Sequence, residues 1–250
     1  MVPRALRPVG IVLVDKPAGP SSFALVADLR RRTRARTGHA GTLDPFATGL
    51  LLLLSGAATR LAPCFFGLDK RYETDVALTA TTSTGDPEGE VVERHEPPSR
   101  DELDARLAAL RGEVELPIPA ASAVKVGGER AYRLARQGIA VEMPLRRSRV
   151  DVLDVITYSD ADDCGVTSVR LDLRVGSGTY VRAIAQALGG HCTSLRRTEI
   201  GPFTIAEADP ERLLAPSAVL ARLPADAVAR VPDDVRRRVL ELEREDTERA

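Results

Sequence analysis

The stretch that most constrains this chain is residues 38–49, which read GHAGTLDPFATG. Three glycines, one proline and two threonines among these twelve residues exclude a helix or a central strand. The stretch lies between a helical pattern and the apolar run of residues 50–54, so apolar elements hold it on both sides. Catalytic residues are often found on loops that a rigid scaffold positions in this way.

Asp44 is the one carboxylate of this loop, and His39 is its one imidazole. Pro45 disfavours a helical backbone at Asp44, so the stiffness of the chain orients the carboxylate. An aspartate before a proline is most often a turn residue that binds its own backbone. The loop has neither the G-x-x-x-x-G-K-[ST] order of a nucleotide-binding loop nor the second histidine of a metal-binding helix. From the residues alone, the function of this ordered loop stays open.

The stretch before the loop has the pattern of a buried strand followed by a helix. Residues 10–16 (GIVLVDK) form a short apolar run that a Pro/Gly turn closes, which predicts a buried strand. Phe23, Val26, Ala27 and Leu29 then recur at helical spacing, which predicts a helix that runs to about Arg30 with these side chains on its apolar face.

Composition is that of a soluble globular protein, with 44% hydrophobic and 28% charged residues over a length that can bury a sizeable core. All but three of the 35 basic residues are arginines, and arginine suits bidentate contact with phosphate. Five of them lie in residues 30–36, which is either a solvated helix end or a contact surface for RNA phosphates. Because the net charge is −1, any RNA-binding charge must be concentrated on one face.

The cysteines and the apolar runs indicate the compartment. Cys64, Cys164 and Cys192 form no C-x-x-C pair and are odd in number, which indicates reduced thiols rather than a disulfide framework. The apolar stretch of residues 11–14 is too short for a signal peptide, and residues 50–54 are far short of a membrane span. We therefore expect a cytoplasmic protein that does not contact a membrane.

GHAGTLDPFATGLL resembles the active-site loop of the TruB family of pseudouridine synthases, which reads approximately G-H-T-G-T-L-D-P-x-A-T/S-G-V-L. The segment DKPAGPSSFALV resembles the family's N-terminal D-K-P-x-G-x-[ST]-S motif, whose lysine and proline pack beside the catalytic loop. The resemblance continues through six motifs in family order, from about Gly10 to Phe203. It implies an α+β fold of mixed α/β type: the pseudouridine-synthase core, an antiparallel sheet flanked by helices, with a thumb-like insertion at about residues 117–146.

The resemblance also implies roles for single residues. Asp44 takes the position of the catalytic residue, and His39 that of the histidine that fills the space left by the flipped base. Tyr72 stands in the family's K-x-Y pattern, whose tyrosine stacks on the target base, although from the strand pattern alone a core tyrosine is the simpler interpretation.

Two further motifs imply the rest of the site. The sequence GTYVR matches the family's G-T-Y-[IV]-R, in which the arginine pairs with the catalytic aspartate and the tyrosine lines the base pocket. These roles fall on Arg182 and Tyr180. Leu195 lies in a segment that follows x-L-R-R-T-x-x-G-x-F, which implies that it forms a wall of the pocket. Arg133 and Arg136 of the thumb-like segment are implied candidates for phosphate contact, or else a solvated helical face.

The chain departs from the family pattern at five positions. Ala40 replaces the family's threonine, Thr79 its glycine, Ser83 its aspartate, Leu116 its glutamine and Ala121 its tyrosine. We expect residues 1–208 to form the catalytic domain. Residues 209–250 are expected to be a short, charged, partly helical tail, too short for the PUA domain that many bacterial relatives append.

The activity implied by the resemblance is isomerisation of uridine 55 in the T-loop of tRNA to pseudouridine. Asp44 would act as nucleophile at C1′ or as base at C2′, and both routes are open. We expect no cofactor, no metal and no obligatory protein partner, with the T-stem-loop of tRNA bound by a monomer. An RNA-binding or tRNA-folding chaperone without catalysis is the alternative. A metal-dependent hydrolase using His39, Asp44 and His191 lacks the ligand spacing that a metal requires.

Overall fold

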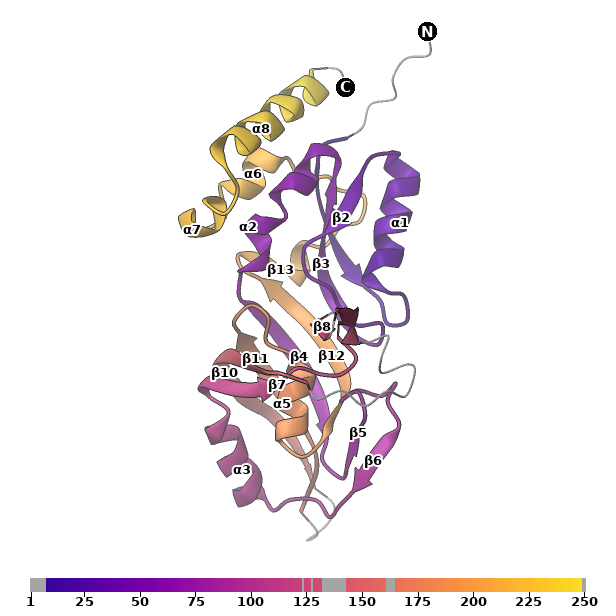
Figure 1. Cartoon of the computed structure of the whole chain (residues 1–250), viewed down its shortest axis with the longest axis vertical. Coiled ribbons are helices and arrows are strands. Elements are labelled where there is room, and N and C mark those ends of the chain that lie inside the picture. The colour runs from indigo at the N-terminus through magenta and orange to yellow at the C-terminus, as the bar shows by residue number, and fades with distance from the viewer. Residues whose placement is uncertain (1–7, 123, 127, 132–142, 161–164, 249–250) are drawn as a thin grey trace. The chain divides into compact units, whose positions relative to one another are not determined.

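The computed structural model describes residues 8–122, 124–126, 128–131, 143–160 and 165–248 (Figure 1). The chain divides into two compact units. The first consists of residues 1–70 together with 196–250, and the second of residues 71–195. Arg133 and Arg136, named above as candidates for phosphate contact, lie outside the described residues.

The sheet of the first unit is built around β3 (Thr48–Ser55), whose five consecutive leucines are all buried. β1 (Gly10–Lys16) pairs antiparallel with the whole length of β3. On the other edge, β2 (Thr37–His39) pairs antiparallel with the end of β3, and β12 (His191–Ile200) pairs parallel with its beginning. β13 (Phe203–Thr204) pairs antiparallel with β12.

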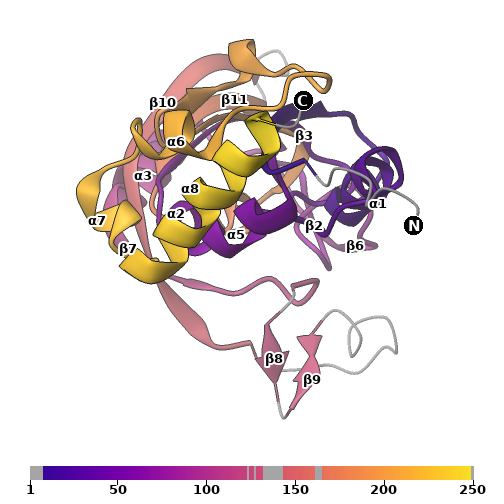
Figure 2. The same ribbon diagram turned by 90° about the horizontal axis from the view of Figure 1, so that it is seen from above.

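Helices cover both faces of this sheet, which explains why β3 is apolar without interruption. Because side chains alternate along a strand, Leu51 and Leu53 face α1 (Ser22–Thr33), whereas the other leucines face the opposite layer. That layer consists of η1 (Gly56–Leu61), α2 (Pro63–Phe66), α6 (Pro216–Leu220), α7 (Ala225–Val228) and α8 (Asp233–Thr247). The expected tail thus contributes three helices to this layer (Figure 2).

The predicted helix before the loop is confirmed, but its predicted apolar face is only partly right. Ser21 caps α1 by accepting a hydrogen bond from the amide of Ala24 at 3.2 Å. Val26 and Leu29 are buried against the sheet, as the spacing indicates. Phe23, in the first turn of the helix, is instead 61% exposed.

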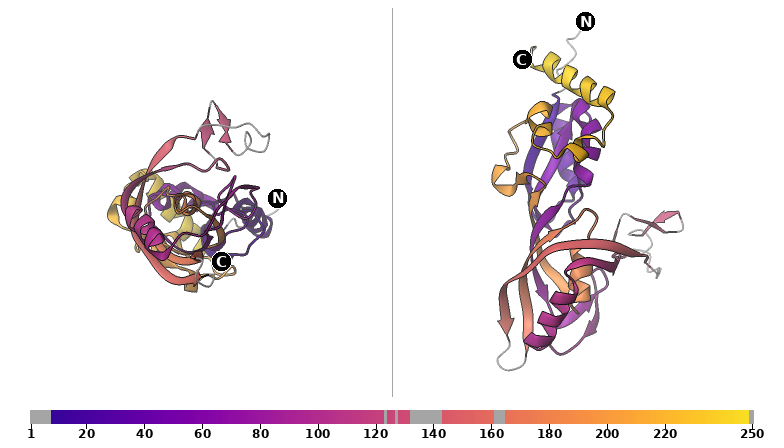
Figure 3. Two further views of the ribbon diagram at one scale, coloured as in Figure 1. Left: turned by 90° about the horizontal axis from the view of Figure 1, so that it is seen from below. Right: turned by 90° about the vertical axis from the view of Figure 1, so that its left-hand side faces the viewer.

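The sheet of the second unit runs in the order β12 (its residues 191–195), β4, β11, β10, β7. β10 pairs antiparallel with both neighbours, and with β11 it forms the long ribbon visible in Figure 3. A capping box formed by Ser99 and Glu102 begins α3. The bounds are β4 (Lys70–Ala77), β5 (Ala80–Thr82), β6 (Val91–Arg94), α3 (Arg100–Ala109), β7 (Gly112–Pro117), β8 (Lys125–Val126), β9 (Glu129–Arg130), β10 (Leu145–Asp160), β11 (Val166–Val175) and α5 (Val181–Ala187).

The prediction of a mixed α/β fold, with a mostly antiparallel sheet and flanking helices, is confirmed. The predicted domain boundary at residue 208 and the thumb-like role of residues 117–146 stay predictions. Within the described ranges, no helix combines the length and the apolar character needed to cross a membrane.

Candidate active site

The Asp44 loop connects β2 to β3 in the first unit and is bound on both sides of the carboxylate by the segment that follows β1. The hydroxyl of Ser22 donates to the carbonyl of Leu43 at 2.9 Å and accepts from the amide of Leu43 at 2.8 Å. The amide of Gly19 donates to the carbonyl of Pro45 at 2.8 Å. The residues before and after Asp44 are therefore both fixed to the beginning of α1.

Lys16 fixes the same loop from the end of β1. Its side chain is fully buried, and its Nζ donates to the carbonyls of Pro17 at 2.8 Å, Pro45 at 3.0 Å and Ala47 at 2.7 Å. A buried ammonium is tolerated only when its donors are used. Three carbonyl acceptors meet that requirement, and two of them belong to the Asp44 loop.

Arg197 of β12 is the second buried cation at this loop, with 1% of its surface exposed. Nε donates to the carbonyl of Leu50 at 2.8 Å, Nη2 to Gly41 at 3.1 Å and Nη1 to Thr42 at 3.4 Å. Gly49 allows this approach, because a Cβ there would lie 2.2 Å from the carbonyl oxygen of Arg197. The φ of Gly49 is +104°, a second reason for glycine at this position.

His39 lies at the end of β2 and is partly buried. Burial lowers the pKa of its imidazole, and the charge of Arg197 lowers it further. The ring is therefore neutral at physiological pH. Its Nδ1 is buried and has no hydrogen-bond partner among the described residues. A buried ring nitrogen without such a partner is compatible with the shape-filling role that the family pattern implies for His39.

Arg182 lies in the first turn of α5, where it is 2% exposed. Its Nη1 lies 3.3 Å from Oδ2 of Asp86 and donates to the carbonyl of Thr84 at 2.7 Å. Its Nη2 donates to the carbonyl of Ala121 at 3.0 Å. Asp86 is itself held by the amide of Glu88 at 3.0 Å and by the Thr84 hydroxyl.

The other predicted residues of the second unit lie on separate elements. Tyr72 is on the buried face of β4 with Thr74 and Val76, as the alternation of that strand indicates. Tyr180 is the residue immediately before α5 and is partly buried. Leu195 is buried on β12. These placements fit the predicted roles without testing them.

A family model described as TruB family pseudouridylate synthase (N terminal domain) matches residues 30–181. The chain belongs to the TruB family. The prediction of the family from the loop motif is thereby confirmed. The match includes the Asp44 loop, Tyr72 and the beginning of α5.

Curated relatives support the same assignment. The tRNA pseudouridine synthase B of Mycobacterium sp. (strain KMS) is 44% identical over 215 residues, which cover 82% of this chain and 72% of that protein. The enzyme of the same name from Thermobifida fusca (strain YX) is 43% identical over 231 residues, covering 88% and 78%. Among solved structures, a chain of a Cbf5-Nop10-Gar1 complex is similar with a TM-score of 0.58 and 26% identity. That similarity covers 78% of this chain and half of the other.

Two of the departures from the TruB pattern, Ala121 and Ser83, contribute backbone groups rather than side chains to their contacts. Ala121 contributes its main-chain carbonyl to Arg182, so replacing the family tyrosine leaves this contact intact. Ser83, the residue before Thr84, donates its backbone amide to the carbonyl of Glu90 at 2.9 Å, a contact that does not depend on its side chain. The substitution at Ala121 is therefore compatible with the arrangement around Arg182.

The sequence predicted no role for Asp86 or Arg197. For Lys16 it predicted only packing beside the loop. Lys16 ends the apolar strand pattern GIVLVDK, and a charged residue on the buried face of such a strand is the signal that could have revealed it. The polar sequence SLRRT gives no such signal for Arg197. Asp86 agreed with the family motif but had no partner in sequence that would point to Arg182.

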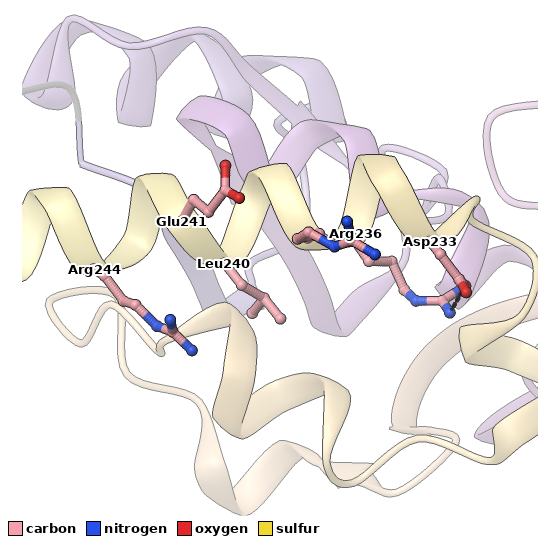
Figure 4. A pocket seen from close by; sticks show the side chains of 6 residues that line it. Asp233, Arg236, Leu240, Glu241 and Arg244 are labelled. Atoms are coloured by element: carbon pink, nitrogen blue, oxygen red, sulfur yellow. Dashed lines mark hydrogen bonds and ion pairs between the residues drawn. The ribbon is translucent and has the colours of Figure 1, made fainter.

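The structure also contains a pocket of about 430 Å³ along α8 (Figure 4). Its lining residues are Asp233, Arg236, Arg237, Leu240, Glu241 and Arg244. The guanidinium of Arg236 already donates hydrogen bonds to two backbone carbonyls, those of Val228 at 2.8 Å and of Val231. The pocket contains none of the TruB site residues. Among the described residues, no group of three or more His, Cys, Asp or Glu could hold a metal ion.

Proposed function

We propose that this chain isomerises the T-loop uridine at position 55 of tRNA to pseudouridine, with Asp44 as the catalytic carboxylate. Family membership and the names of the relatives support pseudouridine formation in tRNA. The observation that carries the proposal for Asp44 is its loop. Lys16, Ser22 and Arg197 hold the backbone on both sides of this one carboxylate. Such rigidity is what a reacting group needs to approach a sugar carbon in one geometry.

The reaction breaks the bond between N1 of uracil and C1′ of the ribose and forms a bond between C5 and C1′. The proton on C5 is lost and N1 gains one, so the product is an isomer and no electrons are exchanged with a cofactor. In one route Asp44 attacks C1′ as a nucleophile, and in the other it removes a proton from C2′. Both routes require the carboxylate to be ionised.

The remaining residues prepare the nucleotide. The target base must leave its stack, which costs a few kcal/mol. In our proposal Tyr72 stacks on the extruded base, and Tyr180 and Leu195 enclose it. The neutral ring of His39 fills the space that the base leaves in the RNA. Arg182 supplies the positive charge that the family pattern pairs with the reacting aspartate.

The test is the variant Asp44→Asn, which is nearly isosteric and keeps the loop that Pro45 stiffens. An amide is neither a useful nucleophile nor a base, so we expect pseudouridine formation to be abolished. Phosphate contacts dominate RNA affinity, so binding should change by less than about tenfold. Tritium release from C5-labelled uridine in tRNA measures the reaction, and a filter-binding titration measures affinity.

Asp101→Asn, at an exposed position in the first turn of α3, is the matched control and should behave as the wild type. Release by Asp44→Asn at the wild-type rate would refute the catalytic role. Binding of tRNA by the wild type without any release would instead favour the chaperone alternative.

A further inference from the structure

Phe23 is an exposed aromatic residue at the beginning of α1. Its side chain is 61% exposed, although its position in the helical pattern predicted burial. Single apolar residues are common on protein surfaces, so exposure alone carries no argument. The position of this ring relative to the catalytic loop is what distinguishes it.

Phe23 directly follows the residue that binds the chain beside Asp44. The hydroxyl of Ser22 makes two hydrogen bonds, at 2.8 and 2.9 Å, to the backbone of Leu43. Leu43 is in turn the residue immediately before Asp44. The backbone of Phe23 is therefore fixed with respect to the proposed reacting carboxylate through a single buried side chain.

Positive charge continues along the same helix. Arg30 is seven residues after Phe23, so the two lie on one face of α1, about 10 Å apart along the axis. Arg34 and Arg36, beyond the last turn, are exposed and form no ion pair within the described ranges. A helix C-terminus favours cations, which is the ordinary explanation for arginines there.

The ion pairs separate two groups of arginines in this run. Arg31 and Arg32 are paired with carboxylates on Asp28 and Glu211. The helix dipole acts only within the last turn, so it does not account for Arg36. Arg34 lies about 16 Å along the helix axis from Phe23, at the opposite end of α1. Exposed guanidinium groups at one end of a helix and an exposed ring at the other match the chemistry of single-stranded RNA, which offers phosphates and base faces in alternation.

We propose that α1 is an RNA-docking surface of the first unit. In this proposal Phe23 stacks on a nucleobase next to the target uridine, and Arg34 and Arg36 bind phosphates of the same strand. The proposal deepens the function proposed above and rests on it for the identity of the RNA.

The first test separates stacking from simple apolar contact. Phe23→Leu keeps an apolar side chain but removes the ring, and we expect the dissociation constant for a T-stem-loop RNA to rise about five- to a hundredfold. Phe66→Leu is the matched control, because Phe66 belongs to the same unit and is 52% exposed. It should leave the affinity unchanged. An RNA that lacks the base next to the target uridine should bind wild type and Phe23→Leu equally.

The second test uses fluorescence. The chain contains no tryptophan, so Phe23→Trp introduces a single indole. Stacking of a base on this indole should quench its emission when RNA is added, and the affinity should stay close to that of the wild type. Phe66→Trp should show no comparable quenching.

The third test concerns the arginines. Removing one arginine that binds a phosphate should reduce the slope of log K against log salt by about 0.7 for single-stranded RNA. Arg34→Gln with Arg36→Gln should therefore reduce the slope by about 1.4. Arg238→Gln on α8, where Arg238 is paired with Glu241, should leave the slope unchanged.

The outcomes separate this proposal from the proposed function, because pseudouridine formation is assayed independently. If the wild type forms pseudouridine but Phe23→Leu binds RNA normally and the indole is not quenched, the docking surface is wrong and the function stands. If the ring and arginine variants lose affinity while the wild type forms no pseudouridine, the surface stands and the function is wrong. A wild type that binds no RNA overturns both.

Discussion

Asp86 and Arg182 form an ion pair in which both side chains are almost completely buried. Such a pair is weak evidence for stability, since desolvating two charges offsets much of their attraction. Its consequence here is positional. The guanidinium is held by one carboxylate and two carbonyls, so it has a single orientation at the beginning of α5.

At the residue scale, we predict that Arg182→Met lowers the free energy of unfolding by about 3–5 kcal/mol, because Asp86 is left as a buried, unpaired charge. Pseudouridine formation should fall more than RNA affinity does. Adding Asp86→Asn removes the stranded charge, so the double variant should be destabilised by less than the sum of the two single variants. Urea unfolding of the three variants measures this coupling. Additive effects would show that the pair is not coupled.

At the level of elements, local patterns predicted β1, α1, β3 and β4 well. β3 is a continuous run of leucines because both of its faces are buried, whereas β4 alternates because only one of its faces is buried. The anchoring of the Asp44 loop could not be read in the same way. Lys16 reaches a carbonyl 31 positions away, and Arg197 reaches one 156 positions away. Such acceptors are created by the fold, and no local window contains them.

The contact between the start of β3 and β12 leads to an element-scale prediction that has its own control. Gly19 and Gly49 have φ values of +102° and +104°, so an alanine is strained equally at both. At Gly19 nothing lies within 4 Å of a new Cβ, whereas at Gly49 the carbonyl oxygen of Arg197 lies at 2.2 Å. We expect Gly19→Ala to cost about 1–3 kcal/mol from backbone strain.

Gly49→Ala should cost at least about 1–3 kcal/mol more than Gly19→Ala, because β3 and β12 must separate. Urea unfolding of the two variants gives the difference directly. Equal losses would mean that the close approach of Arg197 to Gly49 contributes nothing to stability.

At the scale of the whole molecule, buried charge is mostly positive. Among the described residues, the buried lysine, arginine and acidic side chains are Lys16, Lys70, Arg182 and Arg197 on the cationic side and Asp86 on the anionic side. Composition could not predict this, because the net charge of the chain is −1 and such residues are normally exposed. A buried cation whose pKa differs between the folded and unfolded chain makes the stability depend on pH.

Lys70 is the group through which this dependence can be measured. Burial, and the charge of Arg197 after it, lower the pKa of Lys70 from 10.5 to about 8, while its Nζ donates to the carbonyls of Phe66 and Leu68. In the unfolded chain the pKa is about 10.4. Below pH 8 both states carry the proton, and the folded state bears the full cost of a buried charge. Between about pH 8 and 10.5 the unfolded state binds more protons, so the free energy of unfolding rises with pH.

We therefore predict that wild-type stability, measured relative to Lys70→Met, rises by about 3 kcal/mol from pH 8 to pH 10.5. The comparison with Lys70→Met cancels the titration of other groups, including Cys64, because burial raises the pKa of that thiol in both proteins. Urea unfolding at half-unit pH steps measures the two curves. The prediction concerns the slopes of the two stability curves, because at pH 7 the variant loses both a buried charge and the donor of two carbonyls. Parallel curves from pH 8 to pH 10.5 would show that Lys70 titrates at its ordinary pKa.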